Sequence, residues 1–467
     1  MVRLRAVAVV CALVAVSLAA GPARAQVTGQ DAVDSCVSHA GAHAPRLCRS
    51  AQSLVWISAA LCRYGGAPQD TCRAGDGRDV SPAAVEAYEA SWTHRALTLQ
   101  RALDDEIPLR HALIPATHNS YNSFAYPPTL SGYDANHVLS MTDQLRLDMR
   151  SLELDVHWAP SVEGDPAQGG RAPILCHGRS ESGQHPGCTA ERHLRHGLAE
   201  IRAWLDANPH EFLLLYMENH LDGSPAAHAA AAAAITHELG GLVRPPAQRC
   251  APLPMDMSRA EIVAAGHRVV MVGNCDPAVA GEWGSFVHLR GPTWLEGNSG
   301  PGDGFDCEAD RARRDYASSF IRYYDGGTWL QAMTGDVGET PPAETARMVA
   351  CGVNLLGFDH LTPDDPRLDA VVWSWAPGDP AASGCAYRGG DGRFRSDGCE
   401  EPRPYVCFDG THWSVTGPAG SWDQGAEACA AAGTAFSVPR TGWQNAQVPA
   451  GEAWVAYRET AGSWTAH

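Results

Sequence analysis

Lysine is absent from this sequence of 467 residues, so arginine supplies its permanent positive charges. Acidic residues outnumber basic ones by 53 to 35, and the formal net charge is −18. A chain this acidic is repelled by the phosphates of nucleic acids, which argues against nonspecific binding to them. Contacts to a substrate phosphate must come from arginine, whose planar guanidinium suits bidentate recognition, although genome composition explains the missing lysine better.

Long apolar runs are missing after the first 25 residues. Arg3 and Arg5 precede an apolar run from Ala6 to Ala20, and Ala23-Arg24-Ala25 follows it. This order is typical of a secretory signal peptide with its cleavage site. No later stretch approaches the ~20 apolar residues that a membrane helix needs. We therefore expect residues 1–25 to be removed and the mature protein to be soluble and secreted.

Cysteine pairs with the spacing of zinc ligands are also missing, because no Cys-x-x-Cys occurs. Of the 15 cysteines, Cys11 lies in the signal segment, and the 14 that remain suit disulfide bonds in an oxidising compartment. Neighbourhood in the sequence suggests the pairs Cys176 with Cys188 and Cys385 with Cys399. A chain this long can bury a full core, so we expect the disulfides to hold long loops.

Three regions follow the signal peptide. Residues 26–105 contain a predicted helix near Pro82 to Leu103 and no evident chemistry, and we interpret them as a helical N-terminal appendage. Residues 106–377 alternate short apolar runs with helical stretches, the pattern of α/β units. Residues 378–467 are rich in glycine, tryptophan and cysteine, and we interpret them as a small disulfide-containing accessory module.

Eight apolar runs in the middle region predict eight strands. Helical periodicity from Leu194 to Leu205 lies between two of them, and Ser224-Pro225 opens an alanine-rich helix that Gly240-Gly241 ends. Eight βα units in ~250 residues are the size of a TIM (β/α)8-type barrel, whose chemistry lies at the C-terminal strand ends. The runs are HALIPATH (111–118), RSLELDVHW (150–158), PILCHG (173–178), EFLLLYMENH (211–220), HRVVMVGN (267–274), SFVHLRG (285–291), SSFIRYY (318–324) and VNLLGFDHL (353–361).

Polar residues end the first four of these runs. Glu153 and Asp155 alternate with aliphatic residues, so period two turns both carboxylates to one face. Oxygen ligands of this kind suit a hard cation, Ca²⁺ or less favourably Mg²⁺, and two imidazoles can serve transition-state stabilisation and leaving-group protonation. The candidate metal ligands are Asn119, Glu153, Asp155 and Glu218, and the candidate imidazoles are His118 and His177.

Taken together, these four strand ends resemble the catalytic barrel of phosphoinositide-specific phospholipase C. IPATHNSY (114–121) is similar to its first-strand motif, RSLELDVHW to its metal-ligand strand, PILCHG to the segment with its second catalytic histidine, and FLLLYMENH (212–220) to the strand with a further metal-ligating glutamate. The resemblance is close over about residues 110–220. The later strands match in pattern alone.

The resemblance points to the calcium-dependent form of the family. In the metal-free bacterial form, an arginine lies two positions after an aspartate on the second strand, whereas Asp155 follows Glu153 here. The resemblance implies that His118 stabilises the pentavalent phosphorus and that His177 protonates the departing glyceride oxygen. It also implies that Glu153 or Glu218 helps to remove the proton of the inositol 2-hydroxyl, which gives a cyclic phosphate first.

Three further residues are candidates for contacts to substrate. Arg179 follows the His177-Gly178 pair, Arg322 lies next to two tyrosines, and Asp359 ends the eighth run. We expect the nearby Trp373 and Trp375 to pack against the barrel. An acidic protein approaching an anionic membrane is repelled, so a peripheral membrane contact needs a local basic patch or bridging calcium.

The C-terminal region resembles pieces of a C-type lectin-like domain. GRFRSDGCEEPRPYVC (392–407) is similar to the closing disulfide segment of such a domain, and SWDQGAEACAAAGTAFSVPRTGWQN (421–445) to its opening helix and strand. The order of the two pieces is therefore the reverse of the usual one. Because no paired sugar-and-calcium ligand motif accompanies them, we favour an accessory module without lectin activity.

The sequence thus predicts a secreted, Ca²⁺-dependent phosphatidylinositol phospholipase C that acts on a phospholipid or other phosphodiester. One alternative is a glycerophosphodiesterase or phospholipase D-like relative, which usually has an arginine after the first histidine, where Asn119 follows His118 here. Another alternative is a catalytically silent lipid- or carbohydrate-binding protein. Such a protein would lose nothing when His118 is replaced.

Overall fold

The computed structural model describes residues 79–126, 135–178, 188, 192–291, 294–298, 320–326, 339–381 and 383–467. The predicted signal peptide, most of the N-terminal appendage and Arg179 lie outside these ranges. Among the described helices, none has the length and apolar composition to cross a bilayer.

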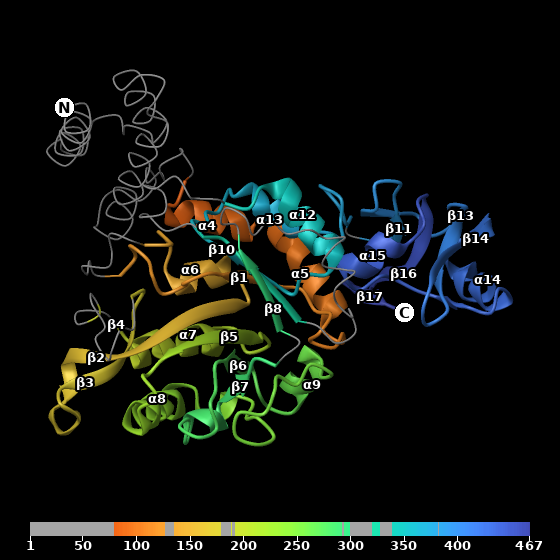
Figure 1. Cartoon of the computed structure of the whole chain (residues 1–467). Coiled ribbons are helices and arrows are strands. Elements are labelled where there is room, and N and C mark those ends of the chain that lie inside the picture. Colours follow the sequence, from red (N-terminus) through yellow and green to blue (C-terminus); the bar gives the residue numbers. More distant parts are fainter. Residues whose placement is uncertain are drawn as a thin grey trace, which may run out of the picture.

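A curled sheet of eight parallel strands forms the centre of the molecule (Figure 1), which confirms the predicted α/β barrel-type fold. Its order is β7-β6-β5-β2-β1-β10-β9-β8, so β7 and β8, which are successive in the chain, lie at opposite ends of the sheet. Side chains from β2 and β9 nevertheless meet inside the curve. The strands are β1 (Ile114–Thr117), β2 (Ser151–Asp165), β5 (Leu213–His220), β6 (Val269–Gly273), β7 (Val287–Leu289), β8 (Trp294–Asn298), β9 (Phe320–Tyr324) and β10 (Leu355–Phe358).

One predicted barrel strand is wrong, although the count of eight is right. PILCHG forms β3 (Arg171–Leu175), which pairs antiparallel with β2 and does not join the parallel order. The eighth parallel strand is β8, which pairs with β9. Gly297 and the charged Glu296 interrupt the apolar pattern of β8, so the sequence does not reveal it. The residues of β3 are apolar because Ile174 is buried within the hairpin and Leu175 is buried in the core against α7.

The β2–β3 hairpin extends beyond the barrel (Figure 1). β2 is 15 residues long, and its outer part pairs only with β3, which runs back toward the barrel. The two-residue β4 (Arg192–His193) pairs with β3 in turn. Val162 near the tip of the hairpin is 95% exposed, whereas Cys176 at its base is buried. The hairpin thereby returns the chain to the barrel immediately before His177.

Helices cover the outside of the sheet, and two of them follow their sequence signals closely. The helix predicted from Leu194 to Leu205 is α7, and the Ser224 side chain caps α8 by accepting from the Ala227 N–H. The helix expected near Pro82 to Leu103 is divided at Ser91, which caps the second part. The helices are α4 (Pro82–Glu89), α5 (Trp92–Asp104), α6 (Met141–Arg146), α7 (Leu194–Ala207), α8 (Pro225–Glu238), α9 (Arg259–Ala264), α12 (Pro342–Cys351) and α13 (Pro366–Val371).

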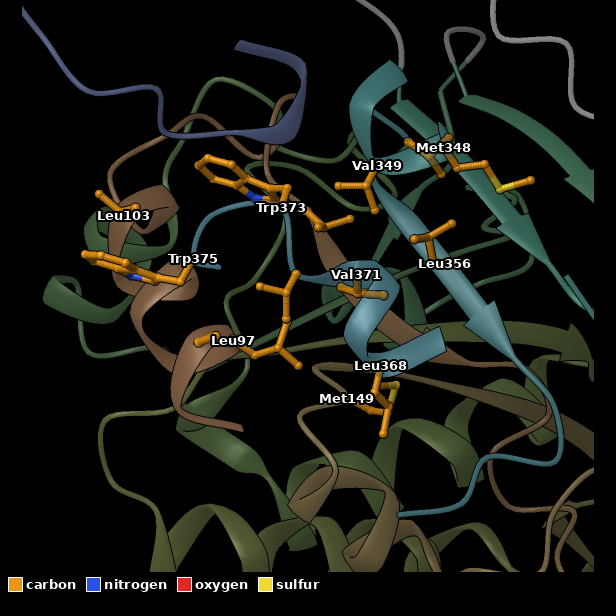
Figure 2. Packing of buried hydrophobic residues seen from close by; sticks show 14 of the residues in the cluster. Leu97, Leu103, Met149, Met348, Val349, Leu356, Leu368, Val371, Trp373 and Trp375 are labelled. Atoms are coloured by element: carbon orange, nitrogen blue, oxygen red, sulfur yellow. The ribbon is translucent and has the colours of Figure 1, made fainter. Parts of the chain in front are cut away.

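A second sheet, in the C-terminal region, shares a hydrophobic core with the barrel. Its main order is β12-β11-β16-β13-β14, and in addition β15 pairs with β13 and β17 pairs with β16. Figure 2 shows Trp373 and Trp375 packed with Leu97 of α5 and Val349 of α12, and the same core includes Tyr457 of β16. The elements are β11 (Cys385–Arg388), β12 (Phe394–Asp397), β13 (Arg403–Phe408), β14 (Trp413–Gly420), α14 (Gly425–Ala431), β15 (Ala435–Phe436), α15 (Gly442–Gln447), β16 (Ala453–Thr460) and β17 (Ser463–Ala466).

Disulfides close local loops in both sheets. The two suggested pairs, Cys176–Cys188 and Cys385–Cys399, are present. Cys250–Cys275 and Cys407–Cys429 add two more. Each spans 12 to 25 residues, so these bridges hold loops and do not join distant parts of the chain.

A buried carboxylate joins α4 and α5 to the barrel. Asp148 accepts hydrogen bonds from Tyr88 (2.8 Å) and from Arg101 (3.1 Å), and it contacts His94 (2.8 Å). Its φ of 65° is left-handed, a conformation that aspartate tolerates better than most residues. Burial alone would raise the pKa of Asp148, but His94 and the nearby guanidiniums lower it to about 2.

Replacing Asp148 by asparagine should lower the free energy of unfolding by about 3 kcal/mol at neutral pH, because buried cations lose their partner. The folded-state pKa of Asp148 lies below the ordinary unfolded value of about 3.9, so its contribution is present above that value. The difference from wild type should therefore shrink as the pH falls from about 4 toward 2. Denaturant unfolding across this range measures it. Asp206→Asn, in an exposed pair on α7, is the control and should cost under about 1 kcal/mol.

Candidate active site

The carboxylates of β2 lie at the C-terminal ends of the parallel strands. Glu153 is in register with Tyr216 of β5, and Asp155 is in register with Glu218. The intervening aliphatic residues, such as Leu154, join the core beneath the helices. Period two therefore separates the two faces of β2 as predicted, with its carboxylates turned to the interior of the barrel.

His118 follows β1 and contacts a buried carboxylate at the end of β10. Its Nδ1 lies 3.2 Å from Oδ2 of Asp359. Burial alone would lower the pKa of His118, but Asp359 and Glu153 outweigh it and raise the pKa above the ordinary value. The ring also contacts Tyr324, with 4.7 Å between ring centroids. A protonated imidazole held in this way can donate a hydrogen bond to an anion or give up a proton.

Asp359 is fully buried, so the structure places it behind His118 and away from a direct contact with substrate. Its Oδ1 accepts from the Asn136 amide at 3.0 Å. His137, the next residue, contacts the His118 carbonyl oxygen through Nε2 at 2.7 Å, and burial lowers the pKa of His137 to about 4. The segment before α6 therefore holds both partners of the His118–Asp359 pair.

A second buried layer supports Asp359 from its other side. The Asp359 N–H donates to Oδ2 of Asp325 at 3.1 Å. Arg367 of α13 donates to the same Oδ2 at 2.5 Å and to the Asp359 carbonyl oxygen at 2.8 Å. Asp365 neutralises Arg367 further, at 2.6 Å. Each charge in this layer has a partner, as burial demands.

Asn119 links the histidine to the carboxylates. Its φ of 48° is left-handed, which asparagine tolerates. Its amide lies between Nε2 of His118, at 3.2 Å, and the Asp155 carboxylate, and the amide orientation with nitrogen toward Asp155 (2.9 Å) satisfies both neighbours. The side chain therefore orients His118 and Asp155 relative to each other.

Glu153 forms a buried ion pair across the interior with Arg322 of β9. The Arg322 guanidinium lies between two aromatic rings, 4.2 Å from the centroids of Tyr216 and Tyr324. Glu153 also accepts from the Asn119 N–H at 3.4 Å. Arg322, expected to bind substrate, is thus held by protein groups beside His118.

Asp155 and Glu218 form the second acidic part of the site, together with His220. One ligand atom of each lies within 4.8 Å of the other two, an arrangement that could hold a metal ion. Burial, with Glu218 and Glu153 nearby, holds the pKa of Asp155 well above its ordinary range. Burial also opposes ionisation of Glu218, but His220 lowers the pKa of Glu218 to about 2. The donor set fits a divalent cation, because two adjacent carboxylates repel each other unless a cation or proton lies between them.

His177 reaches the site by the antiparallel β3. The N–H of Cys176 donates to the Asp155 carbonyl oxygen at 3.2 Å, so His177 comes directly after a residue that is bonded to β2. The Cys176–Cys188 disulfide fixes this return. The expected strand end is therefore present at the site, although it belongs to the hairpin and not to the barrel.

Glu296 of β8 organises the interior next to Arg322. Its Oε1 accepts from Arg290 and from the Trp294 indole, both at 2.8 Å, and from the Tyr216 hydroxyl at 3.0 Å. Arg322 donates to the same oxygen at 3.4 Å. This cluster makes a polar wall with two guanidiniums, which can contact the phosphate or hydroxyl groups of a substrate.

The structure therefore gathers most of the predicted residues at one end of the barrel. It brings together His118, Asn119, Glu153, Asp155, Glu218, Arg322 and Asp359, with His177 entering from β3, whereas Arg179 lies outside the described residues. The sequence did not single out Tyr121, Asn136, Arg290 and Glu296. No local pattern marks them, although Glu218-Asn219-His220 could have drawn attention to His220 as a ligand.

Comparisons with known proteins identify related chains. The family model of the Rv2075c PI-PLC-like domain matches residues 77–365. Two proteins of Mycobacterium tuberculosis, Rv2075c of strain H37Rv and MT2135 of strain CDC 1551, are each 40% identical over 430 residues, which cover 85% of this chain and 86% of theirs. The phosphatidylinositol-specific phospholipase C of Listeria monocytogenes is 12% identical, with a TM-score of 0.36, over 59% of this chain and 97% of that one. A Staphylococcus aureus enzyme of the same name is 10% identical, with a TM-score of 0.40, over 61% and 98%.

Replacing Asp359 by asparagine should lower the pKa of His118, because the carboxylate that raises it is lost and the effect of burial remains. NMR titration of the His118 imidazole measures this shift. Asp364→Asn, an exposed change on the same loop, is the control and should leave the titration unchanged. An unchanged or raised pKa in Asp359→Asn would show that Asp359 does not govern the charge of His118.

Proposed function

Because this chain belongs to the family of the Rv2075c PI-PLC-like domain, we propose that it is a phosphatidylinositol phospholipase C. Membership places it among the phospholipase C-like phosphodiesterases. The finer proposal is cleavage of the glycerol–phosphate bond of phosphatidylinositol, which gives diacylglycerol and a cyclic inositol phosphate. It includes export through the predicted signal peptide and action at a membrane surface.

The observation that carries the proposal is that a histidine with a buried carboxylate partner and a group of carboxylates lie together at one end of the barrel. The His118 imidazole, whose pKa is raised by Asp359, lies beside a carboxylate group that can hold a divalent ion, Asp155 with Glu218. Phosphoryl transfer needs both, because negative charge develops on the phosphate oxygens while the attacking hydroxyl loses a proton. Together, the imidazole and the carboxylate group favour an enzyme over a protein that only binds its ligand.

We assign the residues of the site the following roles in the reaction. Protonated His118 donates to the charged phosphate oxygen of the transition state, and His177 gives a proton to the departing glyceride oxygen. Glu153 or Glu218 accepts the proton of the inositol 2-hydroxyl, which attacks phosphorus. The phosphorus–oxygen bond to glyceride breaks as the bond to the 2-oxygen forms, so atoms and charge balance.

The proposed cation is Ca²⁺, as the resemblance implies, with Mg²⁺ less favoured. Asp155 and Glu218 would hold it, and the expected set adds Asn119 and Glu153. When bound, it neutralises charge on the phosphate and lowers the pKa of a coordinated hydroxyl. Arg322 and Arg290 are the proposed head-group contacts, since both guanidiniums line the interior beside this group.

Hydrolysis of phosphatidylinositol by the purified secreted chain tests the proposal. Cyclic inositol phosphate should form with calcium and not with chelator, and His118→Ala should reduce turnover by roughly 10²–10⁴-fold. His210→Ala, an exposed histidine at the opposite ends of the strands, is the matched control and should retain activity.

Other products would redirect the proposal. Free choline from phosphatidylcholine, or a glycerol phosphate from a glycerophosphodiester, would indicate a related phosphodiesterase. Full activity of His118→Ala would contradict the assigned role of the imidazole. Absence of any cleavage across these substrates would overturn the enzymatic proposal itself.

A further inference from the structure

We infer that a cavity at the N-terminal ends of the barrel strands binds a small zwitterion with an apolar side chain, the class to which the hydrophobic α-amino acids belong. The cavity measures about 480 Å³, and both α5 and α9 line it, together with residues that precede β2 and β5. The candidate active site lies at the opposite ends of these strands, at Asp155 and Glu218. The inference therefore goes beyond the proposed function and does not depend on it.

A buried guanidinium with unused donors is the first reason. Arg259 opens α9, is 3% exposed and lines the cavity. Its Nε donates to Oδ1 of Asp105 at 3.0 Å, and its Nη2 donates to the Arg101 carbonyl oxygen at 3.0 Å and to Asp104. Among the described residues, its Nη1 has no hydrogen-bond partner. This nitrogen can therefore offer two N–H groups to a carboxylate in the cavity.

A carboxylate oxygen beside the guanidinium is the second reason. Asp105 follows α5 and lines the same cavity, and its side chain is 48% exposed. Oδ1 of Asp105 accepts from Arg259, whereas Oδ2 has no hydrogen-bond partner in the described part of the chain. Oδ2 can accept from an ammonium group while Nη1 of Arg259 binds a carboxylate. An α-amino acid carries these two groups on one carbon atom.

Apolar side chains form another part of the wall. Ala102 comes from α5, and Ala260 and Ala264 lie on one face of α9 because they are four residues apart. Val263 and Phe212 line the cavity as well. These side chains can pack against an apolar side chain of the ligand and offer no hydrogen bond to a polar one. Sites for small molecules typically combine such a wall with a few placed polar groups, in cavities of roughly 300–1,000 Å³.

The charges around the cavity favour a ligand without net charge. Three guanidiniums and four carboxylates form one network, and protonation of His94 beside Asp148 would at most make the two signs equal. No positive charge is left over for a lone anion, and a lone cation would face the free Nη1 of Arg259. A zwitterion meets both conditions. The network comprises Arg101, Arg150, Arg259, Asp104, Asp105, Asp148 and Glu211.

Isothermal titration calorimetry of the purified mature chain tests the inference, with L-leucine and L-phenylalanine as titrants. Each should bind at one site per chain with a Kd below about 1 mM. 4-Methylpentanoate lacks the ammonium group of leucine, and 3-methylbutylamine lacks its carboxylate. Both should bind at least roughly 10-fold more weakly than L-leucine, because each leaves one charged group of the cavity without its partner. Glycine, which has no apolar side chain, should bind more weakly as well.

Two variants with matched controls place the binding in this cavity. Asp105→Asn removes the charge beside the ligand ammonium and should weaken L-leucine roughly 10–100-fold. Asp206→Asn removes an exposed, paired carboxylate of α7 and should leave the affinity unchanged. Ala260→Leu narrows the cavity and should weaken L-leucine, whereas Ala229→Leu, at an exposed position of α8, should not. Circular dichroism checks that each variant is folded, and Ala260→Leu gives an independent reading if Asp105→Asn is not.

Several results would overturn the inference. Absence of saturable binding of both amino acids is one of them. Equal or tighter binding of 4-methylpentanoate would indicate a site for anions, and equal or tighter binding of 3-methylbutylamine a site for cations. Unchanged affinity in folded Asp105→Asn or in folded Ala260→Leu would place the amino acid elsewhere on the chain. Hydrolysis of phosphatidylinositol is measured separately, so the proposed function can hold or fail independently of each of these results.

Discussion

The ion pair between Glu153 and Arg322 is the constraint on which the interior of the barrel depends. It joins β2 to β9 across the curve of the sheet, where an unpaired charge of either sign would be costly. Tyr216 and Tyr324 enclose the guanidinium, and Tyr324 in turn contacts the His118 ring. Gly357 of β10 permits this packing, because a Cβ there would lie 3.0 Å from that of Tyr324. The place of the His118 imidazole is thus tied to a charge pair on other strands.

The strand ends of the first half of the barrel could be predicted from the sequence. Glu153 and Asp155 alternate with buried aliphatic residues, and parallel strands bring their C-terminal ends to one edge, so the carboxylates had to lie near His118 and Glu218. The sequence could not show that β8, and not the PILCHG strand β3, is the eighth strand of the parallel sheet. PILCHG is as apolar as a barrel strand because it is buried both within the hairpin and against α7, and the residues of an apolar run do not show whether it pairs parallel or antiparallel.

The second layer of the site was also beyond the sequence. Asn136 reaches Asp359 across 223 residues, and Glu296 accepts from residues of β5 and β9 and from Arg290 after β7, so no local spacing records these contacts. Glu153 was recognised, but its partner Arg322 was assigned to substrate alone. A charged residue reveals its own burial through its neighbours in the strand, and it does not reveal which distant charge compensates it.

The β2–β3 hairpin has a base that is fixed at the site and an outer arm that lies away from it. Asp155 and the residue before His177 are fixed by backbone hydrogen bonding at the base, and the Cys176–Cys188 bridge closes beside them. The outer segment from about residue 159 to 171 contributes no group to the site, and its tip is open to solvent at Val162. Because the register is set below it, this arm can change in length by pairs of residues without moving Asp155 or His177.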